Sequence, residues 1–144
     1  QMAAAMALGA QGVWTGSIWL TVAEADTQPI VIEKFLAASS RDTVRSRAMT
    51  GKPARQLRSG WTEAWEDPSN PRPLPMPLQP RLVREAQARI ARSAHKNPGA
   101  AELSNYFVGQ IVGSMKHVKS VRSVMEELAQ EYADTMERLD EWAK

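Results

Sequence analysis

One short stretch of this chain has the pattern of a buried β-strand, and it constrains the fold more than any other feature. Residues 12–15 (Gly-Val-Trp-Thr) form a largely apolar run that stops at a Gly16-Ser17 turn, whereas the rest of the sequence is mostly helical in pattern. A strand buried alone leaves its backbone N–H and C=O groups unpaired, at about 1 to 3 kcal/mol for each orphaned group. We therefore expect an α/β fold in which parallel strands from a preceding segment pair with this one.

Helical patterns lie on both sides of this stretch. Residues 2–8 favour a helix that ends at Gly9, since glycine readily takes the left-handed conformation that stops a helix. Thr21, with Glu24 three residues later, has the pattern of a capping box and predicts the start of another helix. A further helix is predicted over residues 27–38. The order helix, strand, glycine turn, helix is one repeat of an α/β fold, which we assign to residues 1–40.

The next two regions, residues 41–66 and 67–80, differ in composition. Residues 41–49 are polar and fit an extended stretch, and a Gly-Lys-Pro break follows at 51–53. A short amphipathic helix is predicted after the break, from the helical spacing of its apolar residues Leu57, Trp61, Ala64 and Trp65. Residues 67–80 contain six prolines and predict an extended, non-helical linker.

The last region, residues 81–144, is predicted to be helical. Its first helix opens at Pro80 or Arg81 and ends at Asn97-Pro98-Gly99, and its apolar stripe consists of Leu82, Val83, Ala86, Ile90, Ala91 and Ala94. The last helix runs from about Ser120 to the end of the chain. Its apolar residues alternate steps of three and four: Val121, Met125, Leu128, Tyr132, Met136, Leu139 and Trp142. We expect this second stripe to pack in a core or an interface.

Composition restricts function mainly by exclusion. The chain has no cysteine, which rules out disulfides, zinc–thiolate sites and thiol catalysis and is compatible with a reducing cytoplasm. Its two histidines, His95 and His117, are interpreted as helix-surface residues and leave little material for a metal site. A net charge of +2 is small for a nucleic-acid-binding chain of this length. The apolar runs are too short to span a membrane, and the first residues lack the pattern of a signal peptide. We expect a cytoplasmic protein without a nucleic-acid or membrane partner, and a homodimer stays open.

The Gly16-Ser17 turn is the strongest local signal for chemistry. In a parallel barrel, ligands bind where the strands end, and the loops after the last two strands often hold a phosphate. Glycine lets the backbone approach an anion closely, while the exposed amides and the Ser17 hydroxyl can donate hydrogen bonds to it. The alternative is that Gly16 only permits a tight turn, and the pattern by itself favours this alternative.

Two other groups of residues also have two interpretations each. Gly109, with Gly113 four residues later, fits either close helix packing or, together with Gln110, the wall of a substrate pocket. The middle of the chain carries basic residues that fit either a phosphate of a nucleotide or CoA-like substrate or, more commonly, a solvated basic surface. These residues are Lys52, Arg55 and Arg58.

Three collinear segments resemble the nitronate monooxygenase family, formerly called 2-nitropropane dioxygenases, which are FMN-dependent (β/α)8 TIM-barrel oxidoreductases. Residues 3–17 are similar to the family's seventh helix and eighth strand, which ends in a Gly-Thr or Gly-Ser pair on the FMN phosphate. Residues 50–58 resemble its Thr-Gly-basic-Pro-Ala-Arg stretch, and residues 108–113 resemble its Ala-Gly-Gln segment. The related FMN-dependent enoyl-acyl-carrier-protein reductases share all three segments.

The resemblance implies that this chain is the C-terminal fragment of such a barrel, with helix 7, strand 8 and helix 8, plus a mostly helical substrate-side region. It implies FMN as the cofactor, with Thr15, Gly16 and Ser17 near the phosphate. Gly109 and Gln110 would then lie near the substrate. The family's catalytic histidine and its other, glycine-rich phosphate loop would belong to a preceding segment of the same protein, so no catalytic residue is expected in this chain.

Three functions remain open at this point. The first is oxidation of a nitronate through the flavin, with oxygen as the electron acceptor. The second is NAD(P)H-dependent reduction of an unsaturated acyl-CoA or acyl-carrier-protein thioester, because some actinobacterial relatives act on CoA thioesters in steroid-ring degradation. The third is not enzymatic: a helical interaction module, which would fold without any other segment and bind an acidic partner.

Overall fold

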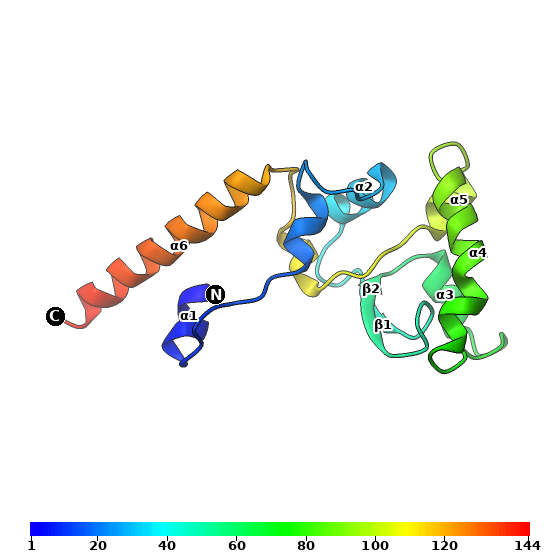
Figure 1. The fold of residues 1–144 in the computed structure, drawn as a ribbon, viewed down its shortest axis with the longest axis horizontal. Coiled ribbons are helices and arrows are strands. Elements are labelled where there is room, and N and C mark those ends of the chain that lie inside the picture. Colours follow the sequence, from blue (N-terminus) through cyan, green and yellow to red (C-terminus); the bar gives the residue numbers. More distant parts are fainter.

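The computed structural model describes residues 1–144, and the chain combines one small sheet with many helices (Figure 1). Figure 1 shows an elongated arrangement in which α6 extends from one end, α3, α4 and α5 gather at the other, and the sheet and α2 lie between. In chain order the elements are α1 (Met2–Ala7), the 3-10 helix η1 (Ser17–Thr21), α2 (Pro29–Ala37), β1 (Thr43–Ser46), β2 (Ala54–Leu57), α3 (Gly60–Glu66), α4 (Leu78–Ser93), α5 (Pro98–Leu103), the 3-10 helix η2 (Gln110–Ser114) and α6 (Val121–Trp142).

The sheet is an antiparallel hairpin, and it confirms the extended stretch predicted within residues 41–49. Strands β1 and β2 pair from Thr43 opposite Leu57 to Ser46 opposite Ala54. A later segment extends this pairing, because Phe107 forms an antiparallel bridge with Gln56. The hairpin therefore joins the middle of the chain to a segment about fifty residues further on. This is a different sheet from the parallel one expected for residues 12–15.

The prediction of a strand at residues 12–15 is wrong for this chain. These residues have no regular secondary structure and no strand partner, Val13 is 42% exposed, and the Trp14 side chain is fully exposed. The physical reason is the one that motivated the expectation of a larger fold: a β-strand gains its hydrogen bonds from a neighbour, and no other segment of this chain lies in register beside it.

The capping box predicted at Thr21 is also wrong. Thr21 is the last residue of η1, and the following residues form a turn instead of a helix. Glu24 caps a distant helix: its two carboxylate oxygens accept from the Val121 N–H, at 3.2 and 3.0 Å. A carboxylate at a helix N-terminus interacts favourably with the free N–H groups and the helix dipole. Glu24 therefore does cap a helix, as the sequence suggested, but the helix is α6 and not one that starts at Thr21.

The amphipathic helix predicted after Gly51 is shorter than expected. Leu57 lies in β2, and α3 begins only at Gly60. Thr62 determines this start, because its Oγ1 accepts from the Ser59 N–H at 2.9 Å and donates to the Ser59 carbonyl at 2.8 Å. The helical spacing from Leu57 to Trp61 was therefore coincidental.

The proline-rich segment is non-helical over residues 67–77, and α4 begins at Leu78, two or three residues before the predicted start. This segment packs closely against the turn of the hairpin. The side chain of Gln79 is fully buried and links the two, since its Oε1 accepts from the Leu74 N–H and its Nε2 donates to the Ala48 carbonyl, both at 2.9 Å.

Helix α4 and its neighbour α5 correct two details of the sequence analysis. Val83 and Ala94 of the predicted apolar stripe are buried, but Leu82 is 57% exposed. The predicted helix end at Asn97-Pro98-Gly99 is wrong, because α4 ends at Ser93 and a turn follows. This sequence starts α5 instead: Asn97 Oδ1 accepts from the N–H groups of Gly99 and Ala100 and caps the helix.

The core is small and lies where α2, the end of β2 and η2 meet. Only 22 of 144 residues are buried, so the chain buries little apolar surface for its length. Phe35 of α2 and Val112 of η2 are fully buried at its centre. The other buried members of this cluster are Val31, Ala38, Leu57, Val108 and Met115.

Helix α6 has the bounds that the spacing of its apolar residues predicted, and Ser120 Oγ caps it by accepting from the Ser123 N–H. Its apolar stripe is largely exposed, because no residue of α6 is buried, although the helix contacts α1. The apolar stripe of α6 does not pack in the core of this chain. That the stripe forms an interface stays a prediction. None of the helices combines the length and apolarity needed to cross a membrane.

Candidate functional site

The turn before η1 is built by local hydrogen bonds. Gly16 precedes the helix, and its carbonyl accepts from the Trp19 N–H at 3.1 Å. The Trp19 indole Nε1 donates to both the carbonyl and the hydroxyl oxygen of Thr15, at 3.1 and 3.0 Å. Thr15 therefore orients the turn through Trp19. The N–H groups of Ser17 and Ile18 have no partner within η1, as at any helix start, so they can donate to a group outside it.

Ser17 connects this turn to the second predicted site. Its Oγ accepts from the Gly109 N–H at 2.8 Å, although the two residues are 92 positions apart. This bond uses one lone pair of the Ser17 hydroxyl. The hydroxyl hydrogen has no acceptor in the chain, so Ser17 can donate it to a further oxygen. The structure thus brings together the two pairs that the sequence analysis singled out, Gly16-Ser17 and Gly109-Gln110.

The glycines of the second site have different structural roles. Gly109 has a φ of −79°, which any residue adopts, and a Cβ there would lie 3.4 Å from Ser17 Oγ, at ordinary contact distance. At Gly113 a Cβ would lie 2.7 Å from the Ser40 backbone nitrogen, which is too close. Close packing, one of the two interpretations offered for this pair, therefore holds for Gly113. The Gln110 side chain is exposed at the start of η2.

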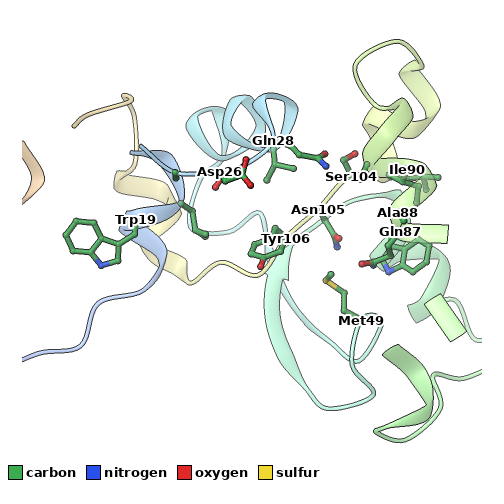
Figure 2. A pocket seen from close by; sticks show the side chains of 17 residues that line it. Trp19, Asp26, Gln28, Met49, Gln87, Ala88, Ile90, Ser104, Asn105 and Tyr106 are labelled. Carbon is green, nitrogen blue, oxygen red and sulfur yellow. The ribbon is translucent and has the colours of Figure 1, made fainter. Parts of the chain in front are cut away.

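An apolar cavity of about 520 Å³ lies beside the turn, between η1 and α2 on one side and α3, α4 and α5 on the other (Figure 2). Trp19 and Tyr106 line it, each two or three positions from a residue of the predicted sites. Its volume is that of a typical small-molecule site, and most of its lining residues are hydrophobic. The sequence analysis missed this cavity because its walls come from five separate parts of the chain.

Two polar side chains in the cavity wall, Asp26 and Asn105, can orient a ligand. Asp26 provides a carboxylate, and Asn105 lies near the middle of the view in Figure 2. Asn105 Nδ2 donates to Gln56 Oε1 at 3.0 Å, which holds the amide in place. The Nε1 of Trp61 is buried and has no partner in the chain. An unpaired buried donor costs about 1 to 3 kcal/mol, so this nitrogen lowers the stability of the fold at this point.

Lys34 holds the two sides of the cavity together. Its Nζ donates to the carbonyls of Glu102 and Ser104, at 2.9 and 2.7 Å, and so ties α2 to the C-terminal end of α5. Partial burial lowers the pKa of Lys34 below its ordinary value, and attraction to the Glu102 carboxylate partly opposes this effect. Nothing in the local sequence around Lys34 indicated this contact.

The structure holds no group of three or more histidine, cysteine, aspartate or glutamate side chains arranged as metal ligands. His95 and His117 are both exposed, as expected, but they lie in turns outside the helices. The predicted location on helix surfaces is therefore wrong in detail, because α4 ends at Ser93 and η2 ends at Ser114.

This chain is similar to known proteins over nearly its whole length. The profile of the nitronate monooxygenase family matches residues 1–131. The candidate monooxygenase Rv1533 of Mycobacterium tuberculosis is 57% identical over 141 residues, which cover 96% of this chain and 37% of that protein. A Bacillus subtilis protein named as a probable nitronate monooxygenase is 32% identical, covering 89% of this chain and 35% of that protein. The structure of FabK from Thermotoga maritima matches with a TM-score of 0.70 at 30% identity, covering 97% of this chain and 42% of that chain.

The fold combines α-helices with a small β-sheet, and a turn with free hydrogen-bond donors lies near an apolar cavity. The chain belongs to the nitronate monooxygenase family. This confirms the resemblance found in its three sequence segments. The chain spans 35% and 37% of the length of the two curated relatives described above.

Proposed function

We propose that the protein containing this chain is an FMN-dependent oxidoreductase that oxidises a nitronate, and that this chain provides part of its cofactor site. Family membership and the relatives named as monooxygenases support the class of reaction. The observation that carries the proposal for this chain is the 2.8 Å hydrogen bond between Ser17 Oγ and the Gly109 N–H. It joins the turn proposed for the phosphate to the segment proposed for the substrate.

The residues of the turn fit the FMN phosphate. Gly16 has no atom within 4 Å of the position where a Cβ would be, so an anion can approach the backbone there. The Ser17 hydroxyl hydrogen and the first N–H groups of η1 supply donors, and donors of this kind stabilise a phosphate without a lysine or arginine. Thr15 contributes by holding Trp19, which keeps the turn in one conformation.

In this proposal the chain is the C-terminal part of a barrel, with residues 1–40 closing the FMN-binding portion and residues 41–144 forming the substrate side. A preceding segment of the same protein supplies the other strands and the catalytic residue. The backbone of residues 12–14 supports this arrangement, since it makes no hydrogen bond within this chain and is available to a neighbouring strand. A cytoplasmic location and a homodimer are further expectations from the sequence.

Bound FMN would supply the redox chemistry, taking electrons from a substrate carbanion and passing them to oxygen. The residues of this chain bind and orient. The apolar walls of the cavity would contact the apolar part of a bound substrate. The Asn105 amide, held by Gln56, would fix the position of a substrate oxygen.

A second candidate function is reduction of an unsaturated acyl thioester with NADH or NADPH as the electron donor. The structural match to FabK, a flavin-dependent enoyl-acyl-carrier-protein reductase, supports it. So does the apolar cavity, because an acyl chain needs a mostly hydrophobic site.

Anaerobic reduction of the bound flavin separates the two functions. A nitronate should bleach the flavin absorbance in a single rapid phase if nitronate oxidation is the reaction, whereas NADH and NADPH should not. Rapid bleaching by a nicotinamide nucleotide alone would exclude the simple nitronate reaction and favour the thioester reductase.

The Ser17→Ala variant tests the proposed phosphate contact. Loss of one donor to a charged phosphate should weaken FMN binding by about tenfold, measured by flavin fluorescence titration of the holoprotein. Ser17→Thr keeps the hydroxyl and should bind FMN nearly as well as the parent protein. Ser93→Ala is the matched control, because the Ser93 hydroxyl bonds only within α4. Equal affinity of the Ser17→Ala and parent proteins would remove Ser17 from the cofactor site.

A further inference from the structure

The β-hairpin concentrates positive charge that the rest of the chain does not share. Residues 41–58 contain six arginines and lysines and one acidic residue, Asp42, whereas the remaining residues contain twelve basic and fifteen acidic ones. All six basic side chains are exposed, and none takes part in an ion pair. The overall charge of +2 therefore conceals a basic hairpin on an otherwise acidic chain.

Strand pairing places like charges together on this hairpin. Arg45 of β1 lies directly opposite Arg55 of β2, so both side chains project from the same face of the sheet. Arg47, two residues after Arg45, follows on that face in the alternation of an extended chain. Arg55 is held by a 3.0 Å hydrogen bond from its Nη1 to Thr43 Oγ1, while the side chains of Arg45 and Arg47 make no hydrogen bond. Like charges directly across a strand pair destabilise the sheet. A bound anion between them would offset this repulsion.

The two free arginines line an open hollow of about 400 Å³, together with one carboxylate and two prolines. Pro53 belongs to the hairpin, and Glu66 and Pro73 complete the lining from the end of α3 and the proline-rich segment. Glu66 forms no ion pair with either arginine. The hollow shares no lining residue with the 520 Å³ cavity and is therefore separate from the site proposed for the substrate.

We propose that this hollow binds a phosphate group of a small-molecule ligand through Arg45 and Arg47, with Arg55 adding positive potential across the strand pair. The planar guanidinium group binds phosphate oxygens in pairs, and it stays charged at any physiological pH. Two neighbouring guanidinium groups at an open hollow suit a compact anion. The net negative charge of the rest of the chain opposes a long polyanion such as nucleic acid. This inference requires no step of the flavin chemistry.

Titration calorimetry with inorganic pyrophosphate as the probe tests the site on this chain without flavin. We expect saturable one-to-one binding that weakens steeply as salt is raised. Arg45→Gln and Arg47→Gln should each weaken binding by about tenfold. Arg89→Gln is the control, since Arg89 is an exposed arginine on α4 outside the hollow, and its affinity should match that of the parent chain.

Two readouts separate a binding role from a structural one. Glu66→Gln removes the one acidic side chain in the hollow and should tighten pyrophosphate binding by several-fold, the opposite direction to the arginine variants. Arg45→Gln should also raise the melting temperature in the absence of the probe, because it relieves the repulsion with Arg55. The proposal is overturned by pyrophosphate binding that does not saturate, by equal losses in Arg45→Gln and Arg89→Gln, or by unchanged affinity in Glu66→Gln. Each of these results leaves the FMN proposal standing, since none involves Ser17 or the flavin.

Discussion

Single side chains in this protein often serve a segment far from their own. Glu24 caps α6 almost a hundred residues later, Lys34 closes onto the end of α5, and Ser17 accepts a hydrogen bond from Gly109. Each of these contacts joins a polar side chain to a backbone group that its own element cannot satisfy. The small core is thereby supplemented by polar contacts between distant segments, and the removal of one such side chain should disturb two elements together.

Asp42, just before β1, should titrate below its ordinary pKa of 3.8. The Ser39 N–H at 2.7 Å and the Ser39 hydroxyl at 2.8 Å both donate to its carboxylate and lower the pKa, and the positive charges of Arg58 and Lys116 add to the effect. Because the folded pKa lies below the unfolded one, this contact stabilises the fold above pH 3.8, and the contribution is lost as the pH falls through the folded value. Carboxyl carbon NMR measures the titration directly.

The Ser39→Ala variant provides the internal check for Asp42. It removes the hydroxyl donor but keeps the backbone N–H, so the pKa of Asp42 should move part of the way back toward 3.8. No movement in this variant would mean that the hydroxyl contributes nothing to the depressed value.

At the scale of elements, the hairpin and the proline-rich segment form one unit. Gly51 in the hairpin turn has a φ of +78°, and a Cβ there would lie 2.2 Å from the Leu74 carbonyl oxygen. Gln79 adds hydrogen bonds on both sides of the same contact. The prolines restrict residues 67–77 to extended conformations, and Gly51 lets the hairpin turn approach them. This proline-rich segment, here called the strap, therefore packs against the turn of the hairpin.

The Gly51→Ala variant should therefore destabilise the chain by about 2 to 4 kcal/mol, since the new methyl group meets backbone atoms that cannot move aside and the positive φ adds strain. Urea unfolding monitored by circular dichroism measures the loss. Gly12→Ala is the matched control: no atom lies within 4 Å of its Cβ position and its φ is not positive, so the change should stay within about 0.5 kcal/mol. A similar stability for both variants would contradict the close contact between the turn and the strap.

At the scale of the whole molecule, large apolar side chains are exposed on α6 and on the segment between α1 and η1, as well as at the start of α4. Trp14 is fully exposed, Leu8 is 91% exposed, and the stripe of α6 includes Met125 and Trp142 at 54% and 77%. Exposed apolar groups concentrated in this way are typical of surfaces that other protein segments cover. Those on α6 and on the segment between α1 and η1 lie toward the end of the molecule where α1 and α6 meet (Figure 1), away from the core of α2 and η2.

If a preceding barrel segment pairs with residues 12–16, Trp14 should become protected when that segment is present. Acrylamide quenching of tryptophan fluorescence, compared between the parent and Trp14→Phe proteins, isolates the signal of Trp14. We expect strong quenching of this signal in the 144-residue chain and weak quenching in the longer protein, where bound FMN should also appear as a yellow colour. Equal quenching in both would show that no strand covers residues 12–16, and a yellow, monodisperse chain of 144 residues would show that the preceding segment is not needed.

The sequence by itself determined the features that depend on near neighbours. The bounds of α6 follow from its three-and-four spacing and its Ser120 cap. The two sites at Gly16-Ser17 and Gly109-Gln110 are predictions from short motifs. Only the tertiary structure decided that those two sites touch, that Phe107 pairs with Gln56, and that Glu24 caps α6. It also decided that residues 12–15 have no strand structure in this chain. The physical reason is that strand pairs, cavities and shared caps depend on which distant segments meet, and local spacing carries no information about those meetings.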